Sequence, residues 1–296
     1  MQSELLSYWR GMIEADVCLR RGQTGAALSR MTEAFAAARA CGAANCHPLR
    51  RKRFAELCVV ALEAGIEPEH VVRSVRRLQL FPAEPPVLVA RWPWRFRVLS
   101  LGRFEIWRDG EPVAARGPQP VPLKVLQGLL ALGAYGGRRV PAERVIDAVW
   151  PDLEGDAGGR AFDTALHRLR RLLGDDDVIE LSRGQVALSA EHCWVDLWAI
   201  DVLAQRETGP EPWFGLYEGP FLASESELAV SAPMRRRAET RFCNAMLRIG
   251  QSYERAGAPE RAVDLYRRAL ELPLSEPGRL NAALSAAEAR FERALR

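Results

Sequence analysis

Residues 160–173 sort their apolar and polar side chains onto two faces of one helix. Apolar residues recur at helical spacing along Arg-Ala-Phe-Asp-Thr-Ala-Leu-His-Arg-Leu-Arg-Arg-Leu-Leu and form one face. The opposite face is a polar stripe, made of Arg160, Thr164, His167, Arg168 and Arg171. A helix of this kind can pack on a core while it presents arginines to the major groove of DNA. An ordinary solvated helix has a similar pattern, so the flanking sequence decides between the two interpretations.

The flanking segments predict further helices and a hairpin. Apolar residues recur at helical spacing over residues 122–132 and 141–150, where Pro141 would occupy the first turn of its helix. Residues 178–188 are typical of two short strands around a Ser-Arg-Gly turn, which would place Arg183 at the tip. Such a hairpin would form a wing beside the polar stripe.

Alternating apolar and polar residues predict a sheet before these helices. The alternation runs over residues 96–107, and an Asp109-Gly110 turn leads to residues 111–113 as a return strand. We therefore expect antiparallel strands here rather than helix. The predicted order is strand, strand, helix, helix, helix, hairpin.

This order of elements, together with three short motifs, resembles the winged helix-turn-helix of the OmpR/PhoB-type transcriptional regulators. The motifs are Leu101-Gly-Arg-Phe104, Val149-Trp-Pro-Asp152 and Leu166-His-Arg-Leu-Arg-Arg-Leu-Leu-Gly174. The resemblance covers roughly a third of the chain. It is most similar to the branch in which a bacterial transcriptional activator domain follows, as in the Streptomyces antibiotic regulatory proteins and large multidomain activators.

The resemblance implies a role for each candidate DNA-binding residue. Arg168 matches a position that points toward base edges in this family, and Thr164 and His167 lie where contacts to the groove or to phosphates are common. His167 is a departure, because the family often has a longer cationic or polar residue there. Arg160 and Arg171, at the two ends of the stripe, would contact phosphates. Arg183, on the wing, would reach the adjacent minor groove or the backbone.

Both ends of the chain carry signs of helical repeats. Residues 194–203 are expected to begin a helix where the activator domain of the family starts, and residues 216–223 are similar to its Tyr-x-Gly-x-Phe-Leu segment. Independently, six residues stand at the offsets of the tetratricopeptide pattern, namely Gly250, Tyr253, Gly257, Ala262, Tyr266 and Ala269. The same offsets recur, with residue types less typical of the pattern, at Ala15, Cys18, Gly22, Ala27, Met31 and Ala34.

These patterns together predict a mainly α protein with a small α+β part. The expected domains are helical repeats at 1–80, a Pro/Trp-rich linker at 81–94, the winged helix-turn-helix at 95–190 and the helical activator domain at 191–296. Prolines in the linker favour an extended, semi-rigid spacer. Its tryptophans are expected to pack on a neighbouring domain rather than swing free.

The charge balance limits how tightly the winged segment can hold DNA. The whole chain has a net charge of +3, and residues 95–195 contain 14 Lys and Arg against 14 Asp and Glu. The positive charge is local, because residues 160–173 contain four arginines and one aspartate. We expect modest non-specific affinity, with tight binding dependent on dimerisation, an effector or contact with RNA polymerase.

No sequence feature indicates an enzyme, a cofactor or a metal. The chain has neither a phosphate-binding Gly-x-x-x-x-Gly-Lys-Ser/Thr loop nor a dinucleotide fingerprint. Cys41, Cys46 and His47 lack a second ligand pair at zinc spacing, and the His192-Cys193 pair lacks a positioned base. Six cysteines without a framework, no signal peptide and no apolar run of about 18 residues favour a reducing cytoplasm and no membrane association.

Two classes of function are compatible with these patterns. In the first, the protein is a sequence-specific bacterial transcription activator that binds double-stranded DNA. In the second, it is a protein-interaction scaffold whose winged helix does not bind DNA. The polar stripe favours the first, because it contains no acidic residue. The sequence leaves open whether the chain is a short regulator or a portion of a larger one with an upstream ATPase module.

Overall fold

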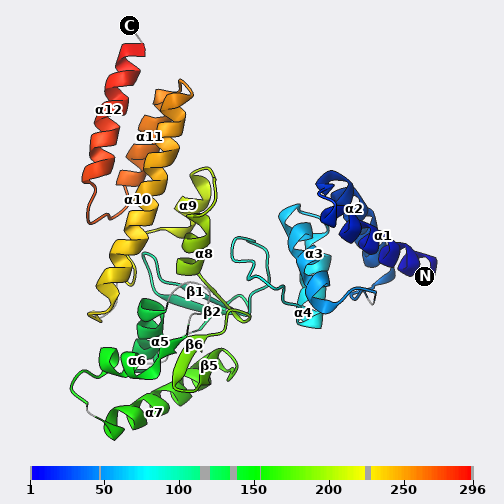
Figure 1. Ribbon diagram of the computed structural model, residues 1–296, viewed down its shortest axis with the longest axis horizontal. Coiled ribbons are helices and arrows are strands. Elements are labelled where there is room, and N and C mark those ends of the chain that lie inside the picture. Colours follow the sequence, from blue (N-terminus) through cyan, green and yellow to red (C-terminus); the bar gives the residue numbers. More distant parts are fainter. Residues whose placement is uncertain are drawn as a thin grey trace. The chain divides into compact units, whose positions relative to one another are not determined.

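The computed structural model describes residues 2–46, 48–113, 121–133, 139–153, 155–223 and 228–294. The chain divides into two compact units, Met1–Trp94 and Arg95–Arg296, which are described separately below (Figure 1). Helices dominate both units, and the sheets all lie in the second. The predicted fold class, mainly α with a small α+β part, is confirmed.

The first unit consists of two helical hairpins. Its helices are α1 (Gln2–Arg20), α2 (Thr24–Cys41), α3 (Arg51–Glu63) and α4 (Pro68–Leu78). Helix α1 packs along α2, α3 packs on α4, and α4 also contacts α2. Aromatic rings fill the space between them, with the ring centroids of Tyr8 and Phe35 6.2 Å apart and those of Phe35 and His70 6.3 Å apart.

The Pro/Trp-rich segment after α4 is folded back on itself. Residues 81–94 contain neither helix nor strand. The Phe81 ring nevertheless lies 6.4 Å from that of Trp92 and 5.9 Å from that of Trp94, and the two tryptophans also contact each other. The expected extended spacer is therefore wrong, because the two tryptophans find their aromatic partner at the start of the same segment.

A four-stranded sheet begins the second unit. Its strands are β1 (Phe96–Leu99), β2 (Glu105–Arg108), β3 (Glu111–Pro112) and β7 (Cys193–Val195), in the order β3-β2-β1-β7. The antiparallel pairing of β1 with β2 confirms the strands predicted over residues 96–107. The helix expected to begin at Trp194 is wrong in its first residues. They form β7, which is buried and pairs in parallel with β1.

A three-stranded sheet contains the predicted wing. Strands β5 (Ile179–Ser182) and β6 (Gln185–Leu188) pair in antiparallel register around Arg183 and Gly184, as the sequence predicts. A third strand, β4 (Val140–Pro141), pairs with β6. Pro141 therefore lies in a strand rather than in the first turn of a helix, because it pairs with Gln185 of β6 and the helix that follows begins only at Ala142.

Three helices lie between the strands of the winged part. They are α5 (Val121–Leu132), α6 (Ala142–Val149) and α7 (Asp156–Leu173), and each contacts the other two. Helix α7 begins one turn before the predicted residue 160. Gly158 in that added turn allows close packing, because a Cβ there would lie 2.8 Å from Ile146 Cγ2.

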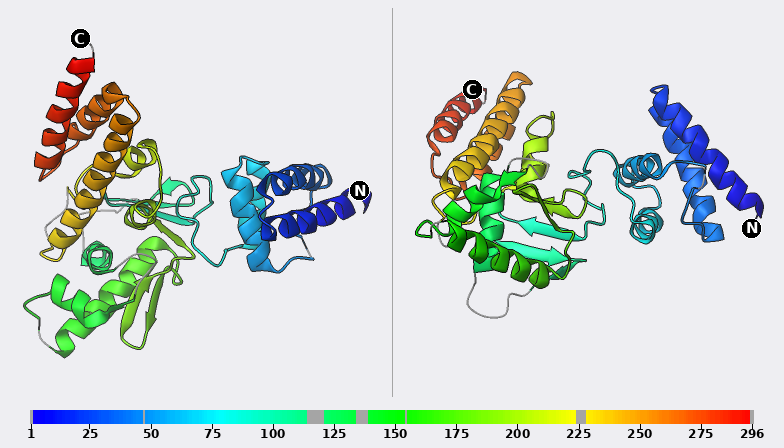
Figure 2. Two further views of the ribbon diagram at one scale, coloured as in Figure 1. Left: turned by 45° about the horizontal axis from the view of Figure 1, so that its top comes forward. Right: turned by 60° about the horizontal axis from the view of Figure 1, so that its bottom comes forward.

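The remaining helices follow β7 without an extended connection. They are α8 (Asp196–Leu203), α9 (Glu211–Leu216), α10 (Ser231–Arg255), α11 (Pro259–Leu270) and α12 (Gly278–Ala294). Helices α10, α11 and α12 lie side by side in both views of Figure 2. Helix α10 also contacts α5, so the helical part packs directly on the winged part.

The two hairpins predicted from the tetratricopeptide offsets turn in the same way. Between α1 and α2, Gln23 N donates to Cys18 O at 2.9 Å, and Gly22 has a φ of 72°. Between α10 and α11, Ala258 N donates to Tyr253 O at 3.0 Å, and Gly257 has a φ of 75°. Glycine adopts this left-handed conformation without a steric penalty, which explains its place in both hairpins.

A buried carboxylate connects the sheet to the helices that follow it. Oδ1 of Asp196 accepts hydrogen bonds from Ser100 Oγ at 2.6 Å and from Leu197 N at 2.8 Å. Oδ2 accepts from Ser100 N and from Leu101 N, the latter at 2.8 Å. Burial raises the pKa of Asp196 to about 6, and the four hydrogen bonds act in the opposite direction.

The Leu101-Gly-Arg-Phe104 motif and residues 216–223 contact each other through backbone hydrogen bonds. Gly102 N donates to Pro220 O at 3.0 Å, and Leu222 N donates to Ser100 O at 2.8 Å. Gly102 has a φ of 92°, and a Cβ there would lie 2.9 Å from Gly219 N. The Leu-Gly-Arg-Phe motif and the Tyr-x-Gly-x-Phe-Leu segment are therefore two sides of one contact.

We predict that Asp196→Asn lowers the free energy of unfolding by about 1–3 kcal/mol, because the amide would point an N–H group at backbone or hydroxyl donors. Urea denaturation measures the change. Asp264→Asn is the control, since Asp264 is exposed on α11. Equal stability of the Asp196 and Asp264 variants would contradict this account of the junction.

Candidate nucleic-acid interface

Helix α7 separates its two faces as the sequence predicts. All five residues of the polar stripe are exposed. The apolar face is buried over α5 and α6, and its fully buried members are Phe162, Ala165, Leu166, Leu169 and Leu173. Burial of this face fixes the rotation of α7 about its axis, so the stripe can only point outward.

The basic side chains of the polar stripe have no partner within the described part of the chain. The side chains of Arg160, His167, Arg168 and Arg171 form no ion pair or hydrogen bond with those residues. Thr164 differs, because its hydroxyl donates to Arg160 O at 2.8 Å and leaves only its oxygen lone pairs for an external donor. The stripe therefore offers free guanidinium and imidazole groups to an anion.

Other arginines of the winged part anchor the C-terminal end of α7. Arg108 Nη1 donates to Leu173 O at 2.8 Å, and Arg170 Nη2 donates to Ile179 O at 2.6 Å. Arg95 forms an ion pair with Asp175, just after the helix. No pattern in the sequence points to these three arginines, because their acceptors lie on other elements. They hold α7 against β2 and the wing.

Arg183, at the tip of the wing, has a backbone conformation that disfavours most residues other than glycine and asparagine. Arg183 is exposed at the tip and has a φ of 51°, and Gly184 follows with a φ of 71°. Two-residue hairpin turns with two positive φ values favour Asn-Gly. An arginine at the first position is strained by roughly 1 kcal/mol, an order of magnitude known for left-handed non-glycine residues.

We predict that Arg183→Gly leaves the free energy of unfolding unchanged or raises it by up to about 1 kcal/mol, because glycine relieves the left-handed backbone. The matched control is Ser182→Gly in β5, which should lose about 0.5–1 kcal/mol from an extended strand. Chemical denaturation compares the two. Equal losses would show that the turn is unstrained.

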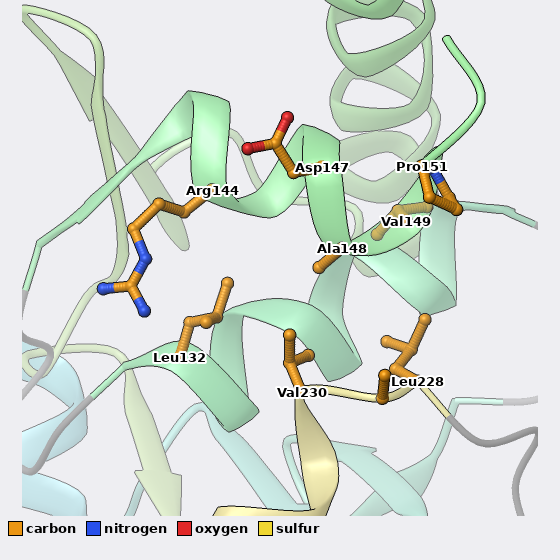
Figure 3. Close-up of a pocket in the computed structure, with 9 residues that line it drawn as sticks. Leu132, Arg144, Asp147, Ala148, Val149, Pro151, Leu228 and Val230 are labelled. Atoms are coloured by element: carbon orange, nitrogen blue, oxygen red, sulfur yellow. The ribbon is translucent and has the colours of Figure 1, made fainter.

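A pocket of about 530 Å³ lies where α5, α6 and the residues leading into α10 meet (Figure 3). Most of its lining is apolar, with Leu132, Val149 and Val230 among the contributors. In Figure 3 the Asp147 carboxylate points to the far side of α6 from Leu132 and Val230. Among the described lining residues, the charged side chains are Arg144 and Asp147, and they do not converge as a pair for acid–base chemistry.

Other residues that the sequence suggested for catalysis or metal binding show no arrangement for either in the described part of the chain. Cys193 is buried in β7, and burial raises the pKa of its thiol, which disfavours the nucleophilic thiolate. The predicted absence of a Cys41, Cys46 and His47 site is not tested, because His47 lies outside the described residues. In the described part of the chain, His, Cys, Asp and Glu side chains form no group able to hold a metal. None of its helices is long and apolar enough to cross a membrane.

The fold is similar to that of a solved structure. The structure of Mycobacterium tuberculosis EmbR in complex with a low-affinity phosphopeptide matches with a TM-score of 0.52 and 20% sequence identity. The match covers 67% of this chain and 56% of the EmbR chain, so this chain spans little more than half of that protein's length. No protein-family description and no curated protein matches the sequence. The likeness supports a winged helix followed by a helical part.

Proposed function

We propose that the protein is a sequence-specific DNA-binding bacterial transcriptional regulator, and an activator, with α7 in the major groove. The observation that carries this proposal is the polar stripe. Its cations are exposed and unpartnered among the described residues, on a helix whose rotation is fixed by burial and whose end is held by Arg95, Arg108 and Arg170. Arginines on a helix held in this way can donate hydrogen bonds to the phosphates and base edges of a duplex.

The individual roles follow from position on the helix and wing. Arg168, near the middle of the exposed face, is proposed to read a guanine edge with its guanidinium fork. His167 and Thr164 would contact the groove or nearby phosphates, with Thr164 acting as an acceptor. Arg160 and Arg171 would contact phosphates at the ends, and Arg183 would reach the minor groove or backbone beside the wing.

The other parts of the chain would serve this DNA-binding function. We assign residues 95–190 to DNA binding, 191–296 to an activator domain and 1–80 to helical repeats joined by residues 81–94. The balanced charge of the winged segment supports dependence on a second copy of the chain or on RNA polymerase for tight binding. The proposed location is the cytoplasm.

We predict that Arg168→Ala weakens binding to a selected operator by roughly 1–3 kcal/mol and flattens preference at one base position, because a bidentate base contact is lost. Selection from random duplexes followed by gel-shift titration measures both effects. Arg206→Ala is the control, since Arg206 is exposed outside the winged part. Unchanged binding by a folded Arg168 variant would support the scaffold function instead.

We predict that Arg171→Ala weakens binding to all sequences alike and lowers the slope of log affinity against log salt by about one, because one phosphate contact is lost. The measurement is a salt titration on the selected operator and on an unrelated duplex. A loss confined to the selected operator would show that Arg171 reads bases rather than the backbone.

A further inference from the structure

A basic pocket lies in the first unit, whereas the polar stripe of α7 belongs to the second. It has a volume of about 430 Å³ and lies between the end of α2 and one face of α4. The residues that line this basic pocket are Arg39, Gly42, Ala44, His70, Arg73, Ser74, Arg76 and Arg77. Its volume falls within the range typical of small-molecule sites.

The arginines of the basic pocket carry more positive charge than the neighbouring acids neutralise. Arg39 pairs with Glu67 at 2.9 Å. Arg73, Arg76 and Arg77 are exposed and form no ion pair with any described residue. Cations near a helix C-terminus are favourable in themselves, which explains Arg76 and Arg77 in the last turn of α4. It does not explain Arg73, which lies a turn earlier beside His70.

The buried histidine of the basic pocket has an unused polar atom. His70 is 6% exposed, and its Nε2 is buried with no hydrogen-bond partner among the described residues. Its ring packs edge-on against Phe35, so the imidazole cannot turn away freely. Burial lowers the pKa of His70. A buried polar atom left unpaired is costly, and a bound ligand would remove that cost.

Among the described residues, the backbone beside the basic pocket bonds the His70 ring at Ala43 but accepts no hydrogen bond from Arg73, Arg76 or Arg77. The last carbonyls of α2 are already bonded, because Ala43 N donates to Ala38 O at 2.9 Å and Gly42 N to Arg39 O at 3.4 Å. Ser74 Oγ donates to His70 O at 3.0 Å within α4. The guanidinium groups are therefore left to recognise something from outside the chain.

We propose that the basic pocket binds a small ligand through a di- or triphosphate group. The guanidinium groups of Arg73, Arg76 and Arg77, which form no ion pair with the described residues, can neutralise several phosphate charges and donate paired hydrogen bonds to phosphate oxygens. His70 adds a donor at the buried wall when the imidazole is protonated, because its ring already bonds the backbone of Ala43 and Nε2 is the nitrogen left without a partner among the described residues. This proposal concerns the first unit alone and does not depend on DNA binding by α7.

The test is isothermal titration calorimetry of the full chain with sodium tripolyphosphate, and separately with ATP, at constant ionic strength. We expect saturable one-to-one binding. The double variant R73Q/R77Q should weaken it roughly tenfold or more, the loss that follows when charge-assisted hydrogen bonds are removed. Both changed side chains are exposed, so the core of α4 stays intact.

The matched control is R21Q/R50Q, which removes the same charge from two exposed arginines of the first unit outside the basic pocket. It should bind within about twofold of the parent, since only general electrostatics change. Similar affinity for tripolyphosphate and ATP would mean that the phosphate chain is recognised, and tighter ATP binding would add contacts to the nucleoside. Both results support the proposal.

Three results would overturn the proposal. They are no saturable binding by the parent protein, an equal loss in R73Q/R77Q and R21Q/R50Q, or a loss of duplex DNA affinity in R73Q/R77Q without any binding of tripolyphosphate. The last result would make the basic pocket a DNA contact. Loss of DNA binding in the α7 variants alone would leave the proposal standing, so the two hypotheses fail separately.

Discussion

The second unit depends on how one buried charge is satisfied. The Asp196 carboxylate receives four hydrogen bonds, three of them from Ser100 and Leu101 at the end of β1. An ionisable group at this depth is stable only when such donors are fixed around it. The bonds therefore tie the end of β1 to the start of α8, and β7 is held in parallel beside β1 as a consequence. The winged part and the helical part share a single sheet for this reason.

The position of that sheet decides what the arginines of the winged part do. Arg95 precedes β1 and Arg108 ends β2, and both reach the C-terminal end of α7, where acceptors lie. Arg168 and Arg171 lie on the exposed polar stripe of the same helix, where the described residues offer no acceptor. The residue type is the same in both groups, so the difference in role comes from the packing around each side chain. An arginine with a partner positions the helix, and one without is available to bind.

Local patterns in the sequence predicted the elements that local forces form. Helix α7, the β5–β6 hairpin and the turn at Gly257 each follow from spacing within some twenty residues. Strand β7 could not be predicted in this way, because three residues have no period and their partner β1 lies about a hundred residues earlier. The basic pocket was missed for the same reason, since Arg39 and His70 meet only after α2 and α4 pack. The DNA-binding roles of the candidate residues remain predictions.

Asp196 and His70 show how a buried polar group can be assigned to structure or to binding. Both are almost inaccessible, and burial disfavours the charged form of each. Every oxygen of Asp196 has its donors within the fold, so nothing is left for a ligand, and removing the group would break the junction. The Nε2 of His70 has no partner in the described part of the fold, and Arg39, Arg73, Arg76 and Arg77 line the same pocket. A ligand that brings accepting oxygens to these arginines would also offer a partner to the protonated ring and offset the cost of burying Nε2, which is the physical reason to place a ligand there.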